Sequence, residues 1–291
     1  MLDPDSLNQA VLTAKPASQP TPVVLDSPHS GSAYPPDFTS VLTHAQLQTL
    51  EDAYVDELFA PAVSHGATLV SAQFPRGYID PNRAIDDVHP PALADAWPHR
   101  AQPTQKALLG VGLVFTRTPN GADIYTKALT SDALLHRIDQ YYKPYHRALA
   151  RALSDTRAQF GFAWHINCHS MPSRSGHLLR SQSRRRPDFC IGDRFGTSSD
   201  ESFMQLVVAE LQALGYETAI NEPYAGLECL HRHGNPSKGI HSIQLEINRD
   251  LYLDEQSHLR SDGFATLQQR LTRLIQRLGI AAMEDYRCAT E

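Results

Sequence analysis

Trp164-His165-Ile166-Asn167-Cys168-His169-Ser170-Met171-Pro172-Ser173 alternates between apolar and polar residues and then ends in a turn-forming sequence. Alternation with a period of two is typical of a β-strand. One face would carry Phe162, Trp164, Ile166 and Cys168, and the other Ala163, His165, Asn167 and His169. Residues 131–159, just before, have a helical pattern with a kink expected at Pro144. Helix, short turn and strand form half of a parallel-sheet unit, so we predict an α/β fold.

The two histidines of this stretch could serve a metal ion in two ways. In a helix, His165 and His169 would share one face and could bind one zinc ion together. In a strand, their Cα atoms would be roughly 13 Å apart at ~3.3 Å per residue. A single ion could then use only one of them. We predict the strand and expect His169, where the strand ends and function gathers, to be the ligand.

The composition excludes several classes of protein. With 41% hydrophobic and 20% charged residues, the 291-residue chain can bury a substantial core. A net charge of −6 and a pI of about 6.1 argue against a nucleic-acid partner. The basic run at residues 180–186 is expected to be a solvated loop rather than an anion site. The motifs of nucleotide-binding proteins and of serine hydrolases (Gly-x-Gly-x-x-Gly, the P-loop, Gly-x-Ser-x-Gly) are missing from the sequence.

The cellular compartment of the protein is predicted from its first residues, its apolar segments and its cysteines. The first residues lack the basic and apolar regions of a signal peptide, and no window of about 18 apolar residues could span a membrane. The four cysteines are widely spaced, which fits reduced thiols and excludes a thiolate zinc site. We therefore predict a cytoplasmic protein without a membrane partner, and its oligomeric state stays open.

The remaining segments suggest one domain with a short arm. Residues 1–20 are polar and proline-rich and are expected to form a loosely ordered N-terminal arm, followed by a single domain over residues 21–291. An apolar run at residues 22–26 predicts a strand that ends at a loop containing His29. Residues 43–64 predict one helix, opened by a Thr43–Gln46 capping box. Residues 84–130 are rich in proline and glycine, and we predict that they form a long loop segment over the site, called the excursion below. A closing helix is expected over residues 256–278.

Three carboxylates are candidates for chemistry. Asp52 and Asp56 would lie one turn apart on the helix of residues 43–64, where two like charges slightly destabilise a helix. They could form a solvated acidic face, or one of them could bind a metal. Glu246 lies in the alternating stretch of residues 241–249, on its polar face and near the end of a predicted strand. A carboxylate in that position is a candidate general base.

A second group of residues follows the apolar stretch of residues 67–74. Arg76, Asn82 and Arg83 could bind a carboxylate, because arginine pairs with carboxylates through two parallel hydrogen bonds. An ordinary surface loop with ion pairs is the alternative.

These side chains match the parts of a metal-dependent hydrolase. Two histidines at strand ends and one carboxylate would supply three N/O ligands and leave a zinc position open for water. Zinc lowers the pKa of that water, and a nearby carboxylate removes its proton. Because the residues are scattered along the chain, spacing alone does not establish such a site.

Six short motifs, in one order along most of the chain, resemble those of the N-formylglutamate amidohydrolase family. They are Pro28-His29-Ser30-Gly31, the segment of residues 52–58, the segment of residues 76–83, Cys168-His169-Ser170-Met171-Pro172, Asn221-Glu222-Pro223-Tyr224-Ala225-Gly226 and Gln244-Leu245-Glu246-Ile247-Asn248-Arg249. The resemblance implies a three-layer α/β/α fold with a mainly parallel mixed sheet, similar to that of zinc carboxypeptidases. It also implies one zinc ion per chain and cleavage of N-formyl-L-glutamate, a small anionic N-acyl amino acid.

The resemblance assigns a role to each candidate residue. His29, Asp52 and His169 would bind zinc, with Asp52 preferred over Asp56, and Glu246 would be the catalytic base. Arg76, Asn82 and Arg83 would bind substrate carboxylates.

Two differences from the family leave the substrate open. Many relatives have Asp-Cys-His-Ser where this chain has Asn167 before Cys168, and Asp-Leu-Asn-Arg where this chain has Pro81 after Asp80. The competing hypotheses are a carboxypeptidase-like hydrolase of other N-acyl amino acids or peptides, and a non-catalytic dicarboxylate-binding protein.

Overall fold

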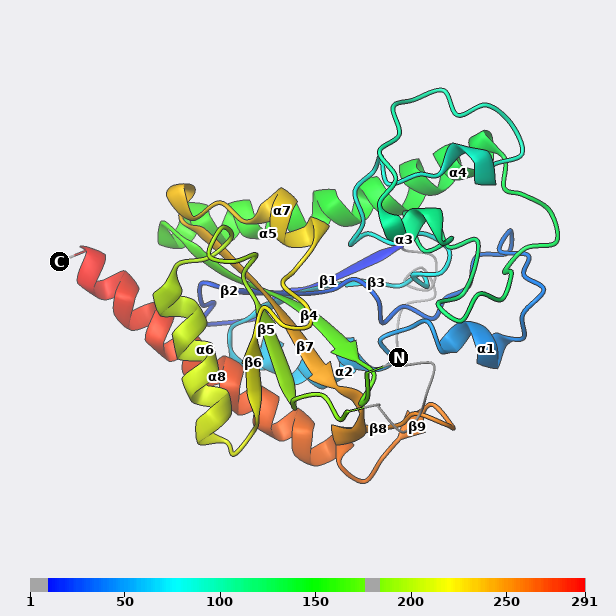
Figure 1. Ribbon diagram of the computed structural model, residues 1–291. Helices are drawn as coiled ribbons and strands as arrows, with labels where there is room; N and C mark the ends of the chain where they lie inside the picture. The colour runs from blue at the N-terminus through cyan, green and yellow to red at the C-terminus, as the bar shows by residue number, and fades with distance from the viewer. Residues whose placement is uncertain (1–9, 176–183, 291) are drawn as a thin grey trace. The chain divides into compact units, whose positions relative to one another are not determined.

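The computed structural model describes residues 10–175 and 184–290 (Figure 1). The basic run at residues 180–186 lies mostly outside the described residues. The chain divides into two compact units. Within the described residues, unit 1 comprises residues 10–12, 28–53 and 71–149, and unit 2 comprises residues 13–27, 54–70, 150–175 and 184–290. That residues 21–291 act as a single hydrolytic domain stays a prediction.

A seven-stranded sheet with strand order β1-β3-β2-β4-β7-β5-β6 organises the fold. Its strands are β1 (Val11–Ala14), β2 (Val23–Ser27), β3 (Thr68–Ala72), β4 (Ala163–Met171), β5 (Phe189–Gly192), β6 (Thr218–Ile220) and β7 (Ile240–Asn248). β4 pairs in parallel with β2 and with β7, and β5 pairs in parallel with β6. Within this sheet, β5 pairs with β7 in the antiparallel direction. The prediction of an α/β fold with a mainly parallel mixed sheet is confirmed.

Within unit 2 the sheet is covered on both faces, as Figure 1 shows. The C-terminal part of α5 (Lys143–Phe160) and α7 (Glu228–His233) lie on one face, and α6 (Glu201–Ala213) and α8 (Phe264–Thr290) on the other. On β4, Trp164 stacks on Phe203 of α6, with ring centroids 4.6 Å apart. Every residue of β4 is buried, so both of its faces, including the polar one, lie inside the protein.

The predicted strand around His169 is confirmed, with one correction at its end. We expected regular structure to stop at His169, but β4 continues through Ser170 to Met171. Each of these residues keeps a partner on β7, where Met171 is level with Asn248. The pairing with a long neighbour extends the strand beyond the point where its own sequence stops alternating.

The predicted helix of residues 43–64 is wrong in its middle. It is divided into α1 (His44–Gln48), α2 (Val55–Phe59) and a 3-10 helix (Ala60–His65). The Thr43–Gln46 capping box is present, and Gly66 ends the last segment with φ of 97°. Between α1 and α2, Tyr54 adopts left-handed backbone angles (φ 63°), which a continuous helix cannot contain. Asp52 therefore lies in a link between helices, not on one.

Three further elements differ from the prediction. β1 forms within the predicted N-terminal arm, so the expectation of a loose arm is wrong for residues 11–14. The closing helix α8 begins at Phe264, because the residues before it form the small hairpin of β8 (Leu253–Asp254) and β9 (Leu259–Arg260). α7 lies within residues 222–239, a segment whose glycine and proline residues favour a loop.

The kink predicted at Pro144 is a π-helical turn. α4 (Ser131–Arg137) leads into the π turn (Ile138–Tyr142), which leads into α5. Pro144 has no backbone N–H to donate to the carbonyl four residues earlier, so the preceding turn widens. Across the described residues, no helix is both long and apolar enough to cross a membrane.

Asp56, the alternative metal ligand, lies at the start of α2 and should affect stability. Burial raises its pKa to about 6, and the charge of Glu57 adds to this, while backbone N–H groups and Arg260 oppose it. The folded state therefore binds more protons than the unfolded state, whose aspartate has a pKa near 3.9. The free energy of unfolding should fall as the pH rises from about 4 to about 6 and should stay lower above that.

We therefore expect Asp56→Asn to be more stable than the parent protein by about 1–2 kcal/mol at pH 8. The two proteins should have equal stability near pH 4, where both side chains are neutral. Urea unfolding at both pH values measures the difference, with the exposed Asp285→Asn as a control. A gain that is the same at both pH values would contradict the explanation by burial.

Candidate functional site

His29 is held by two carboxylates within unit 1. Its side chain is 2% exposed. Its Nε2 lies 2.7 Å from Oδ1 of Asp80, and its Nδ1 lies 3.2 Å from Oδ2 of Asp52. The backbone N–H of Asp52 also donates to the carbonyl of His29, at 3.0 Å. We call His29, Asp52, Asp80 and Arg76 the His29 cluster.

Close backbone packing fixes the loop that carries His29. Gly31 lies against the backbone of Gln73 and Phe74, where an added Cβ would come within 2.4 Å of their atoms. The N–H of Ala33 donates to the carbonyl of Gln73 at 2.8 Å. Only glycine permits this approach, so the Pro28-His29-Ser30-Gly31 motif has a structural reason for its glycine.

Asp80 is the fully buried anchor of the cluster. Burial by itself would raise its pKa, but Arg76, His29 and Arg83 outweigh burial and hold the pKa well below its usual range. The Arg76 guanidinium donates to Oδ2 of Asp80 at 2.8 Å, and the backbone N–H of Asn82 donates to Oδ1 at 2.8 Å. Asp80 is therefore an ionised acceptor, and the 2.7 Å contact makes Nε2 of His29 the donor.

This polarity suits a cation beside His29 and Asp52. A His29 ring that carries its only proton on Nε2 would direct the lone pair of Nδ1 toward a carboxylate oxygen at 3.2 Å. Two acceptors at that separation repel each other unless a proton or a metal ion is shared between them. Divalent metals in proteins are commonly bound by a histidine nitrogen and an aspartate oxygen, while the other ring nitrogen of the histidine donates to a second carboxylate. His29, Asp52 and Asp80 have this arrangement. The residues of the His29 cluster therefore fit such an ion.

The three predicted substrate-binding residues lie in unit 1 and differ in their environments. Arg76 is 20% exposed, pairs with Asp80, and its Nη1 lies 3.8 Å from Asp52. Arg83 is buried and makes only long ion pairs, 4.0 Å to Asp80 and 3.9 Å to Asp87. Asn82 is also buried. The ion pair of Arg76 with Asp80, at 2.8 Å, is shorter than either ion pair of Arg83.

His169 and Glu246 are neighbours in unit 2. The register of the two parallel strands places His169 of β4 level with Glu246 of β7. Both side chains are buried, at 2% and 7% exposure. Gln244, two residues earlier on the same face of β7, donates to Oε1 of Glu246 at 2.9 Å. The predicted base and the predicted ligand therefore share one face and one end of the sheet.

His165 has a different environment from His169, although both lie on the polar face of β4. Its Nε2 lies 2.7 Å from Oδ1 of Asp26, and its Nδ1 lies 2.9 Å from Oγ of Ser242. All three side chains have 0% exposure. The partners are those of a Ser-His-Asp triad, but a serine sealed in the middle of β7 cannot reach a substrate. The hydrogen bonds of His165 join β4 to β2 and β7 inside the sheet.

Sequence reasoning missed three residues of these surroundings: Asp80, Asp26 and Asn167. Asp80 was part of a quoted motif, but nothing in its spacing indicated that it would contact His29, 51 positions away. Asp26 is the only charged residue in the apolar run of residues 22–26, and a buried charge needs a partner. That isolated charge was the available signal.

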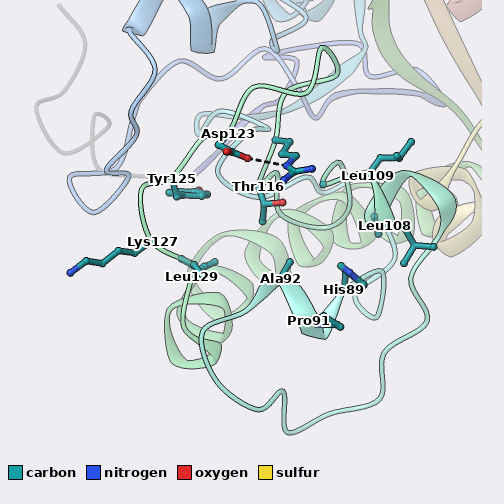
Figure 2. Close-up of a pocket in the computed structure, with 14 residues that line it drawn as sticks. His89, Pro91, Ala92, Leu108, Leu109, Thr116, Asp123, Tyr125, Lys127 and Leu129 are labelled. Atoms are coloured by element: carbon teal, nitrogen blue, oxygen red, sulfur yellow. Dashed lines mark hydrogen bonds and ion pairs between the residues drawn. The ribbon is translucent and has the colours of Figure 1, made fainter.

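A cavity of about 320 Å³ lies elsewhere in unit 1, within the excursion of residues 84–130 (Figure 2). Its lining consists of His89, Pro91, Ala92, Ala107, Leu108, Leu109, Gly110, Thr116, Arg117, Asp123, Tyr125, Lys127, Ala128 and Leu129. Arg117 and Asp123, both exposed, neutralise each other there through a 2.9 Å ion pair. None of the predicted site residues lines this cavity.

Comparisons with known proteins identify the class of enzyme. A family model described as N-formylglutamate amidohydrolase matches residues 21–253. The N-formylglutamate deformylase of Pseudomonas aeruginosa is 28% identical over 240 residues, covering 81% of this chain and 84% of that protein. The one from Pseudomonas putida is 29% identical over 274 residues, covering 91% and 95%.

A solved structure agrees with these relatives. The crystal structure of N-formylglutamate amidohydrolase from Ralstonia eutropha JMP134 is similar with a TM-score of 0.89 and 39% identity, over 95% of this chain and 99% of that one. The chain is thus an enzyme, a hydrolase that acts on an amide bond. It belongs to the N-formylglutamate amidohydrolase family, as its motifs suggested.

Proposed function

We propose that this enzyme hydrolyses N-formyl-L-glutamate to formate and L-glutamate with the help of one divalent metal ion, expected to be zinc. The names of the two Pseudomonas relatives and of the Ralstonia structure support the substrate. The observation that carries the metal is the buried His29 Nδ1 and Asp52 Oδ2 pair, 3.2 Å apart, with Asp80 on the opposite side of the ring.

We infer that His29, Asp52 and His169 hold this ion together, each with one ligand atom. Chain connectivity supports the combination. Asp26 of β2 pairs with Asn167 of β4. His29 follows Asp26 by three residues, and His169 follows Asn167 by two. Parallel strands that leave the sheet side by side bring such residues to the same edge.

When bound, the ion would lower the pKa of a water molecule and polarise the formyl carbonyl. Glu246, level with His169, is proposed to take the proton of the attacking water. It would then deliver that proton to the nitrogen of the leaving glutamate as the C–N bond breaks. Gln244 orients the carboxylate for this transfer through its 2.9 Å hydrogen bond.

Arg83 is proposed to bind a substrate carboxylate. It is buried, and its Nε has no hydrogen-bond partner among the described residues. A buried guanidinium donor without a partner is costly, and an anionic substrate would satisfy it. Asn82 and Arg76 are proposed to complete this carboxylate-binding group.

Arg83→Lys should separate binding from chemistry. Lysine keeps the positive charge but loses the planar fork that pairs with a carboxylate. We expect KM to rise by about tenfold to a hundredfold and kcat to change far less. Arg117→Lys, in the exposed Arg117–Asp123 pair, is the matched control and should leave both constants unchanged. An unaltered KM in Arg83→Lys would remove Arg83 from the substrate site.

The first test of the function combines metal analysis with formate release. We expect near-stoichiometric zinc in the purified enzyme and chelator-sensitive release of formate from N-formyl-L-glutamate. Metal without formate release would reject this substrate and lead to other N-acyl amino acids and short peptides. Formate release from the fully metal-free enzyme would reject the metal mechanism.

A further inference from the structure

A buried chain of hydrogen bonds leads from the centre of the sheet to His169. Ser242 contacts His165, which contacts Asp26, as described above. The side-chain amide of Asn167 then donates to both oxygens of Asp26, at 2.9 Å each. Finally, Oδ1 of Asn167 lies 2.7 Å from Nε2 of His169. We call Ser242, His165, Asp26, Asn167 and His169 the buried relay, and all of it lies in unit 2.

The chemistry of the relay fixes which atom donates at each step. The NH₂ group of Asn167 faces the carboxylate of Asp26, because its nitrogen lies 2.9 Å from both oxygens. The amide of Asn167 then has only its oxygen to offer to His169. Oxygen at 2.7 Å from Nε2 must accept, so the proton of the neutral His169 ring is on Nε2. Nδ1 consequently carries the lone pair.

We infer that Asp26 and Asn167 are positioning residues that set the tautomer of His169 and thereby select Nδ1 as its ligand atom. This inference rests on the proposed function in one respect, namely that His169 binds a metal ion. Asp26 is not among the proposed ligands; it would act through the amide of Asn167, whose NH₂ group donates to it. Where a carboxylate would commonly contact a metal-binding histidine directly, this chain uses an amide with a carboxylate behind it.

Three variants distinguish this role from simple packing. Asp26→Asn removes the charge that orients the amide, so Asn167 can turn its NH₂ group toward His169 and favour the other tautomer. Asn167→Asp places two carboxylates side by side in a buried position. The double variant Asp26→Asn/Asn167→Asp exchanges the two groups, so one carboxylate again accepts from Nε2 of His169. Hydrogen bonding should be restored in the exchanged pair.

The test is the tautomer of His169 in the metal-free protein, read by long-range ¹H–¹⁵N NMR with labelled histidine. Comparison with His169→Gln assigns the signals. We expect the Nε2–H form in the parent protein, a shift toward the Nδ1–H form in Asp26→Asn, and a return in the double variant. Zinc affinity, measured by competition with a chelating dye, should fall about tenfold to a hundredfold in Asp26→Asn and recover in the double variant.

Asp193→Asn is the matched control. Asp193 is a buried carboxylate of the same unit, and it accepts from the side chain of Asn221 at 2.8 Å, with no histidine in the pair. Its replacement should lower stability without altering the spectrum of His169.

Two outcomes would overturn the inference: an Nδ1–H tautomer in the parent protein, or an unchanged tautomer in Asp26→Asn. The parent spectrum alone is decisive if the variants do not fold. An enzyme with the expected tautomer that releases no formate would reject the proposed substrate and leave this inference standing.

Discussion

Glu246→Gln is expected to lower kcat for N-formyl-L-glutamate by about three orders of magnitude, because a general acid–base residue typically contributes 10²–10⁴. Glutamine has the same shape but cannot take the proton of the attacking water. Glu246 lies level with His169 on the neighbouring strand, and Gln244 already orients it. Steady-state kinetics on metal-loaded enzyme measure the effect, with metal content determined on the same samples.

The zinc content of Glu246→Gln should match that of the parent enzyme, because Glu246 is not among the proposed ligands. Glu217→Gln, an exposed glutamate of the same unit, is the control and should keep full activity. Retention of full activity by Glu246→Gln would refute its role as the base. Loss of zinc together with activity would show that Glu246 belongs to the ligand set instead.

Asp52→Asn is expected to weaken zinc binding by more than about a hundredfold, since changes in outer partners alone cost 10–100-fold. The amide lacks the negative charge that would balance the proposed ion beside His29. Activity at limiting zinc should fall in parallel. Competition with a chelating dye gives the affinity, and added zinc should restore part of the activity if the loss is one of binding.

Asp56→Asn is the matched control, four residues along the chain. Asp56 lies in the first turn of α2, whereas Asp52 lies in the link before it and contacts His29. Zinc affinity should therefore be unchanged in Asp56→Asn. If this variant lost zinc and Asp52→Asn kept it, the ligand assignment would have to be reversed.

Much of the fold follows from the sequence because alternation and length identify buried strands. The polar and apolar faces of β4 were predicted residue by residue, and Glu246 was predicted on the polar face of β7; the register adds which strands are neighbours. The helix of residues 43–64 could not be resolved, because its apolar spacing continues through the break. Only the left-handed angles of Tyr54 reveal the break, and a tyrosine gives no local sign of such angles.

The candidate site was predictable in its residue types and not in its outer contacts. His29 and Asp52 were chosen from a turn, a carboxylate and a family resemblance, and the structure places them 3.2 Å apart. Asp80 could not be assigned, because its role depends on a contact made across 51 positions of sequence. Asp26 and Asn167 are likewise joined across 141 positions. Long-range pairing of buried polar groups leaves almost no local pattern.

The hydrogen bonds to Nε2 of His29 and of His169 would affect both the rate at which the proposed metal ion binds and the conformational entropy lost on binding. The Nε2 atom of each ring lies at hydrogen-bond distance from a buried side chain, Asp80 in the first case and Asn167 in the second. Immobilising a mobile side chain costs about 0.5–1.5 kcal/mol, and here that entropy is lost during folding rather than at the moment of binding. We therefore expect each ring of the metal-free enzyme to keep the orientation that it would use to bind the proposed ion, so uptake of that ion would require no search among rotamers.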